Sequence, residues 1–409
     1  MEIIIERCAG LDVHKQAVVV SVRMPGEGGK RRVETQTFSS MSEELLKLLD
    51  WLSSHGVTHV AMESTGVYWR PVYALLEDEF EVLLVNARHV KNVPGRKTDV
   101  RDSEWLAQLL ECGLLKGSFI PPRPIRDLRD LTRYRKVLIR ERGHHVNRVE
   151  KTLELTNIKI SSVVTDIMGK TGRAILQALI AGETDPDRLA DLAQGLLKNK
   201  KAALREAVKG KITPHYAFLL EQQLRIIDEL TRRIEEFDAR IEASMRPFDE
   251  AYRCAMSMPG IAERSAQAIL AEIGTDMSRF PTPGNLVSWA RVCPGNNESA
   301  GKRRSSATGK ANGWLRATLN EAAWAAARTK NSYYRALYQR MKARQGPKKA
   351  IGAVQHAMLR ALWYMLSRHV LHQDLGADYF TRNNVARVSR HHVRRLEQLG
   401  YRVTLEEAA

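Results

Sequence analysis

Short apolar, β-branched runs alternate with amphipathic runs in the first hundred residues. The runs that predict strands cover residues 8–22, with an interruption near Gly10, and then 32–38, 58–62 and 81–86. Helical periodicity covers residues 42–53 and 69–79 and returns just after Asp99. The resulting order of strand, strand, helix, strand, helix, strand, helix predicts an α/β sandwich for an N-terminal domain of residues 1–120.

Helical patterns dominate the rest of the chain. Residues 125–155 read as one long helix, and residues 216–241 repeat apolar side chains at steps of three and four, as in a coiled-coil seam. That seam fits packing within one chain and self-association equally well. A Pro259-Gly260-Ile261 turn before a helical stretch resembles a helix-hairpin-helix unit. We therefore expect a helical, coiled-coil middle (121–247), a mainly α C-terminal domain (248–372) and a tail (373–409).

Charge changes this picture more than composition does. Apolar residues make up an ordinary 44% of the 409 residues, but the formal net charge is +17. Between Gly301 and His372 there are fifteen Lys or Arg residues and one acid, Glu321. This excess indicates a polyanionic partner, with nucleic acid ahead of an anionic membrane surface. We expect no membrane span, no signal peptide and, with four scattered cysteines, a reducing cytoplasm.

Basic residues also crowd the long middle helix, where residues 123–151 hold ten Lys or Arg residues against four acids. Such a helix suits a phosphate backbone, although a salt-bridged solvent face would look similar. The candidate nucleic-acid ligands are Arg133, Arg140, Lys302, Arg303, Arg304, Lys310 and Arg316.

Acidic residues fall where the predicted strands and helices end or begin. Asp12 lies in the first apolar run, Glu63 follows a strand, and Asp99 and Asp102 share a face at a helix start. Alternatively, Asp12 is a turn residue, Glu63 caps the next helix and the pair is a solvated first turn. Together the four carboxylates form a set suited to Mg²⁺, as in ribonuclease-H-like folds.

Ser299 lies in a small, polar segment directly before Lys302-Arg303-Arg304, which predicts a basic loop. A serine needs a base or a metal to become a nucleophile, and no His or Asp adjoins this one. Any activating group would have to come from elsewhere in the chain.

The acidic set, the helical linker, the Pro-Gly-Ile hairpin and the Asn297-Glu298-Ser299 segment together resemble the DEDD-type insertion-sequence transposases, also described as bridge-RNA-guided recombinases. The resemblance runs from about Gly10 to His372. It implies a RuvC-like N-terminal domain whose four acids bind Mg²⁺, and a C-terminal domain that supplies Ser299 as a nucleophile.

The resemblance further implies a phosphoserine link to DNA, an RNA encoded by the element that chooses donor and target DNA, and a dimer or tetramer in the cytoplasm, associated with the nucleoid. Two alternatives stay open: a RuvC-like, metal-dependent structure-specific endonuclease in which water attacks, and a non-catalytic RNA- or DNA-binding scaffold.

Overall fold

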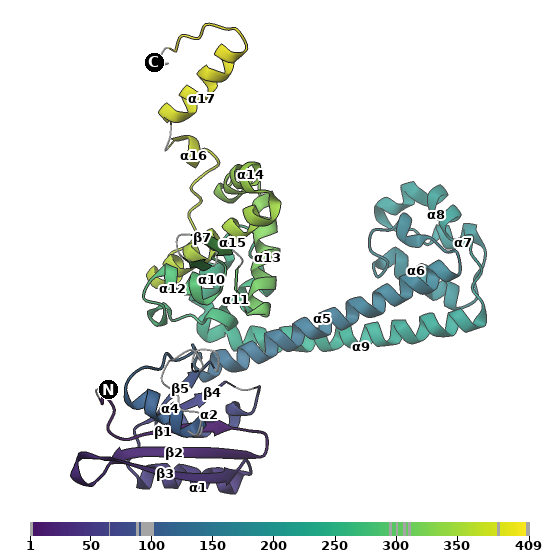
Figure 1. Ribbon diagram of the computed structural model, residues 1–409. Coiled ribbons are helices and arrows are strands. Elements are labelled where there is room, and N and C mark those ends of the chain that lie inside the picture. The colour runs from purple at the N-terminus through teal and green to yellow at the C-terminus, as the bar shows by residue number, and fades with distance from the viewer. Residues whose placement is uncertain are drawn as a thin grey trace. The chain divides into compact units, whose positions relative to one another are not determined.

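The computed structural model describes residues 3–64, 66–86, 90, 102–293, 297–299, 302–305, 308–309, 312–382 and 385–405. It divides into two compact units, Met1–Ile120 and Pro121–Ala409 (Figure 1). Within these described ranges, no helix combines the length and the apolar character that crossing a bilayer requires.

The first unit is built on a five-stranded mixed sheet in the order β3-β2-β1-β4-β5. Its strands are β1 (Cys8–Val13), β2 (Ala17–Pro25), β3 (Arg31–Ser39), β4 (His59–Glu63) and β5 (Glu81–Val85). The first three are antiparallel neighbours, whereas β4 runs parallel to both β1 and β5. The mixed α/β N-terminal sheet predicted from the sequence is therefore present.

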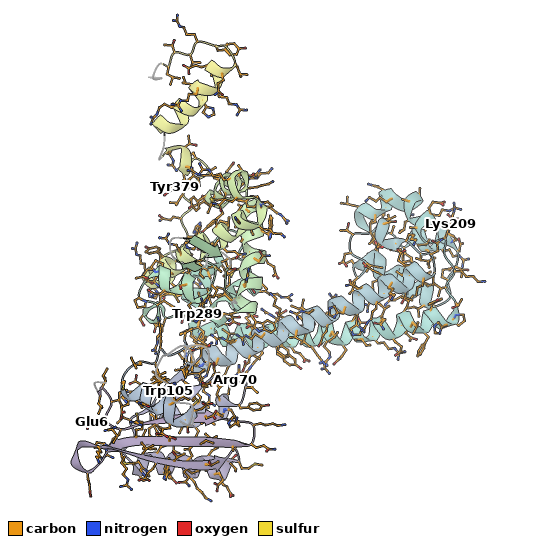
Figure 2. The ribbon with its side chains drawn as sticks, viewed as in Figure 1. Glu6, Arg70, Trp105, Lys209, Trp289 and Tyr379 are labelled. Atoms are coloured by element: carbon orange, nitrogen blue, oxygen red, sulfur yellow. The ribbon has the colours of Figure 1, made fainter. Side chains whose placement is uncertain are left out.

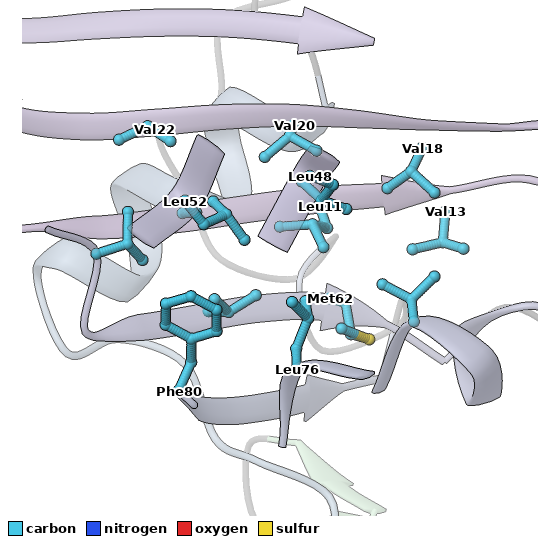
Figure 3. Packing of buried hydrophobic residues seen from close by; sticks show 14 of the residues in the cluster. Leu11, Val13, Val18, Val20, Val22, Leu48, Leu52, Met62, Leu76 and Phe80 are labelled. Carbon is cyan, nitrogen blue, oxygen red and sulfur yellow. The ribbon is translucent and has the colours of Figure 1, made fainter. Parts of the chain in front are cut away.

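Helices cover both faces of this sheet. On one face, α1 (Ser42–Ser54) and α2 (Trp69–Leu76) bury Leu48 and Leu76 against Leu11 and Met62 of the sheet (Figure 3). On the other face lies α4 (Asp102–Glu111), whose Leu110 packs with Ala61. Because side chains alternate along a strand, every second residue of β1 and β4 faces α4.

The sequence predicted one strand region at residues 8–22, interrupted near Gly10, and the structure differs from this prediction. The segment forms two antiparallel strands, β1 and β2, and Gly10 lies inside β1 opposite Ser21. The chain turns at residues 14–16, where the His14 amide donates to the Ala17 carbonyl oxygen. Residues 14–16 read His-Lys-Gln, so a polar break between the two apolar runs marks the turn that the prediction placed at Gly10.

Helices make up most of the second unit. The long helices α5 (Arg123–Leu155) and α9 (Pro214–Met245) lie side by side, and α6 (Lys170–Ile180), α7 (Pro186–Asp191) and α8 (Lys201–Ala207) close the far end of this hairpin, near Lys209 (Figures 1 and 2). Leu220, Leu224 and Ile227 of α9 are buried in a core that includes Val149 and Leu153 of α5. Packing within the chain thus accounts for this part of the predicted seam, and self-association stays a prediction.

Beyond the hairpin come α10 (Asp249–Met256), α11 (Glu263–Ile273), α12 (Pro283–Trp289), β6 (Asn297–Ser299), β7 (Lys302–Ser305), α13 (Gly313–Arg328), α14 (Tyr333–Gln345), α15 (Pro347–Arg368), α16 (Tyr379–Arg382) and α17 (Val385–Gln398). Short 3-10 segments lie at Glu27–Gly29, Ile160–Ser162, Gly195–Lys200, Arg246–Phe248 and Met277–Arg279. The strands β6 and β7 pair with each other as a separate two-stranded sheet.

Candidate catalytic site and nucleic-acid surface

Two of the predicted acids lie at the same edge of the first unit's sheet. The parallel strands β1 and β4 pair Leu11 with Met62, so Asp12 and Glu63 are the next residues at the carboxyl ends of both strands. Ligand chemistry in α/β sheets gathers at this edge. Asp12 is therefore a strand residue and not part of a turn, and Glu63 ends β4 well before α2 begins at Trp69.

Both acids are on the face of the sheet that α4 covers. A Cβ built on Gly10 would lie 2.2 Å from the Ser103 carbonyl oxygen, so Gly10 faces the first turn of α4. Asp12 comes two residues later in the same strand and shares this face. The same alternation places Glu63 on the side of Ala61, which packs against α4.

The start of α4 is fixed to the sheet by two close contacts. Only a residue without a side chain fits at Gly10, because α4 occupies the space of a Cβ. The buried hydroxyls of Ser21 and Ser103 lie 2.9 Å apart, which ties the helix to β2. Asp102, the first residue of α4, therefore lies over the face of the sheet that carries Asp12 and Glu63. Asp99 lies outside the described residues.

The donor set suits Mg²⁺ in chemical terms, because it consists of carboxylate oxygens from two strands and one helix start. The Asp12 side chain is 26% exposed, so a ligand can reach it. Among the described residues, no group of three or more His, Cys, Asp or Glu side chains is arranged to hold a metal ion. The fourth member of the predicted set, Asp99, is not among these residues.

His14 lies beside Asp12, a neighbour that the sequence analysis did not predict. Its Nε2 atom lies 3.0 Å from Oδ2 of Asp12, and its ring is 60% exposed. A protonated His14 would pair with the same carboxylate that a metal ion would need. The only signal in the sequence was its position two residues after Asp12, next to a turn.

Ser299 lies in a short hairpin rather than in the predicted open loop. It ends β6 and pairs with Lys302 of β7, while Glu298 pairs with Arg303. Backbone pairing therefore fixes the position of the Ser299 Cα atom relative to the following basic strand. The side chains of Ser299, Lys302, Arg303 and Arg304, as well as all of Lys310, lie outside the described parts of the structure.

A buried carboxylate holds the segment that follows this hairpin. Asn312 caps α13 by accepting hydrogen bonds from the amides of Trp314 and Leu315, and its Nδ2 donates to Oε2 of Glu272 at 2.5 Å. Glu272 is only 2% exposed and accepts two hydrogen bonds from Arg133, at 2.7 and 2.8 Å. The start of α13 is thus held to α11 and α5.

These contacts change the ranking of the predicted basic residues. The Arg133 guanidinium is neutralised by Glu272, so it is a weaker candidate for phosphate binding than the sequence indicated. Arg140 and Arg316 are exposed and keep their places as candidates. The sequence could not separate these cases, because Glu272 lies 139 residues from Arg133.

We expect Glu272→Ala to lower the free energy of unfolding by about 3 kcal/mol, because it leaves Arg133 and the Asn312 cap without their carboxylate. Urea unfolding followed by tryptophan fluorescence measures the change. Glu321→Ala is the matched control. Glu321 pairs with Lys136, which lies on α5 like Arg133, but the Glu321 side chain is 69% exposed. Its effect should stay below about 0.5 kcal/mol, and equal shifts for both variants would contradict the assignment.

The Pro-Gly-Ile turn joins α10 to α11 and packs on α13. Gly260 has φ +85°, and a Cβ there would lie 2.3 Å from the Ala322 carbonyl oxygen. The Ile261 amide donates a hydrogen bond to the Met258 carbonyl oxygen, and the Ala262 amide donates one to Ser265 Oγ. Two amides of this helix-hairpin-helix-like turn therefore already have partners within the protein.

Two family models match this chain. The model of the DEDD transposases of the IS110 group, described as "Transposase", matches residues 9–158, and the model described as "Transposase IS116/IS110/IS902 family" matches residues 252–339. Together they cover more than half of the chain. The first match spans all four predicted acids, and the second spans Ser299 and the basic strand after it. No curated protein matches the chain.

The two matches agree with the α/β sheet that carries acids at its edge and with the helical C-terminal region. The chain therefore belongs to the DEDD-type insertion-sequence transposases, enzymes that cut and rejoin DNA.

Proposed function

We propose that this transposase breaks and rejoins DNA through Ser299, with Mg²⁺ held by Asp12, Glu63, Asp99 and Asp102. The observation that carries the proposal is the placement of Asp12 and Glu63 at one edge of a parallel strand pair, on the face where α4 starts with Asp102. Three described acids from three elements thus share one side of the sheet, although they are far apart in the sequence.

The chain's own groups have defined parts in this chemistry. The Ser299 hydroxyl gives its proton to a carboxylate and attacks the phosphorus. An Oγ–P bond forms while the bond from phosphorus to a sugar oxygen breaks. The departing oxygen takes up a proton and becomes the free hydroxyl of the released strand, and the other DNA end stays joined to the protein. A hydroxyl of another strand then attacks, restoring the serine. Bound Mg²⁺ would stabilise the negative charge that develops on the phosphate.

The covalent link explains why no external energy source is needed, because the phosphodiester energy is kept in the phosphoserine bond. Arg303 and Arg304 follow Ser299 on the paired strand and would contact the same phosphate. We further propose that an RNA encoded by the element selects donor and target DNA, and that two or more copies of the chain assemble on them.

The test is metal removal. The protein, DNA carrying the element ends and a target, and RNA transcribed from the element's flank are incubated with Mg²⁺ or with a chelator and run on a denaturing gel. We expect a slowly migrating protein–DNA adduct and rejoined DNA with Mg²⁺, neither with the chelator, and recovery when Mg²⁺ is added back. Free 5′-phosphate ends without an adduct would instead identify a nuclease that uses water.

A further inference from the structure

A large groove in the second unit is lined by α13, α14, α15 and the segment after α15. Its volume is about 2160 Å³, well above the roughly 300–1,000 Å³ typical of small-molecule sites. The basic residues that line it are Arg291, Arg316, Lys348, Lys349, Arg360 and Arg368. The described lining contains no Asp or Glu. The groove therefore suits a long, negatively charged ligand.

Six cations carry the positive charge of this groove. Across the part of the chain that the structure describes, no ion pair joins any of these six cations to a carboxylate. Burial and the nearby Arg360 lower the pKa of His356, so this groove histidine stays neutral near pH 7. Arginines and lysines alone supply the charge, which a polyanion would neutralise.

Aromatic side chains lie among these cations. The Tyr364 ring is 37% exposed, and the Arg368 guanidinium lies over it at 5.0 Å from the ring centroid. A second groove aromatic, Trp324, is partly exposed and packs against Tyr338. Nucleic-acid bases stack on such aromatic and guanidinium planes when they are unpaired. In a duplex the base faces are covered by neighbouring base pairs, and only phosphates would meet the groove.

We propose that this groove binds an unpaired strand of nucleic acid, with phosphates on Arg316 and Arg360 and a base stacked beside Tyr364 and Arg368. The inference rests on the proposed function only in that a transposase handles nucleic acid. It assigns a strand-binding site that is independent of Ser299 and of the acids.

The test is equilibrium binding of the full-length protein to labelled oligo(dT), oligo(U) and a duplex of equal length. Binding is measured by fluorescence anisotropy in a buffer that contains a chelator. Tyr364→Ala should weaken binding of the unpaired strands about tenfold, with little change in duplex binding. Tyr364→Phe should bind as the wild type does, because it keeps the ring. Loss for only one of oligo(dT) and oligo(U) supports the groove and identifies the strand that it prefers. Loss for both supports a groove that accepts either strand.

The phosphate contacts have a separate signature. Arg360→Ala should weaken binding of unpaired strands and lower the slope of log affinity against log salt by about 0.7, whereas Tyr364→Ala should leave the slope unchanged. Arg344→Ala is the matched control, because Arg344 is exposed on α14 but does not line the groove. Melting curves establish that each variant is folded.

Unchanged single-strand binding by Tyr364→Ala, or equal losses for duplex and single strand, would overturn the inference. Binding in a chelator needs no catalysis, so failure of the groove and failure of the serine mechanism give different results. Ser299→Ala should bind the unpaired strands as the wild type does.

Discussion

Ser299→Ala is expected to abolish the covalent protein–DNA adduct and to reduce strand rejoining by about a thousandfold or more. The substitution removes the one oxygen that forms the bond to phosphorus under the proposed mechanism. The backbone pairing of Ser299 with Lys302 does not depend on the hydroxyl, so the hairpin should be kept. A denaturing gel with end-labelled DNA measures both the adduct and the rejoined product.

Ser305→Ala is the control for this result. Ser305 lies on the partner strand of the same hairpin, opposite Asn297, and the substitution is chemically identical. It should leave adduct formation within about twofold of the wild type, because the Ser305 hydroxyl has no part in the proposed bond to phosphorus. An adduct that persists in Ser299→Ala, or one that is lost equally in both variants, would contradict the serine mechanism.

Asp12→Asn is the second substitution expected to have a large effect, again a loss of about a thousandfold in strand rejoining. Asparagine has the size of aspartate but no charge, so it is a poor ligand for a hard divalent cation. The variant should also lose the rise in melting temperature that Mg²⁺ gives the wild type, because binding to the folded state alone stabilises it. That second measurement does not depend on DNA, RNA or turnover.

Asp50→Asn provides the comparison, because Asp50 is an exposed residue of α1 in the same unit. It should keep both the activity and the response to Mg²⁺. If Asp12→Asn retained full activity and the normal Mg²⁺ response, Asp12 would have no part in metal binding, and the acidic site would have to be abandoned.

Local periodicity predicted much of the fold of the first unit. Residues 42–53 form a helix that extends only to Ser54, and residues 81–86 form a strand that ends at Val85. The helix buries one apolar stripe against the sheet. The strand is apolar on both faces, with Leu84 in the core that α1 covers and Val85 packed with Trp105 of α4. The turn at residues 14–16 was missed although His14, Lys15 and Gln16 form a polar break, because Gly10 was taken as the interruption and the structure places Gly10 inside β1.

The candidate site was predicted less completely, for two physical reasons. Contacts between distant residues leave no local pattern, so the pairing of Arg133 with Glu272 could not be read from a basic helix. Short polar strands carry little hydrophobic signal, so β6 and β7 looked like a loop. The acids were easier to find, because charged residues in or after apolar strands are unusual unless they bind something.

The helical hairpin of α5 and α9 has a consequence for how the two matched regions relate. The regions are separated along the sequence by residues 159–251. Even so, the Arg135 guanidinium in the first region donates to Gln267 of the second at 2.7 Å. The chain between Arg135 and Gln267 therefore forms an excursion that runs out along α5 and comes back along α9. Its outer end could grow, shrink or be exchanged for another module, and the parts that it links would keep their contacts.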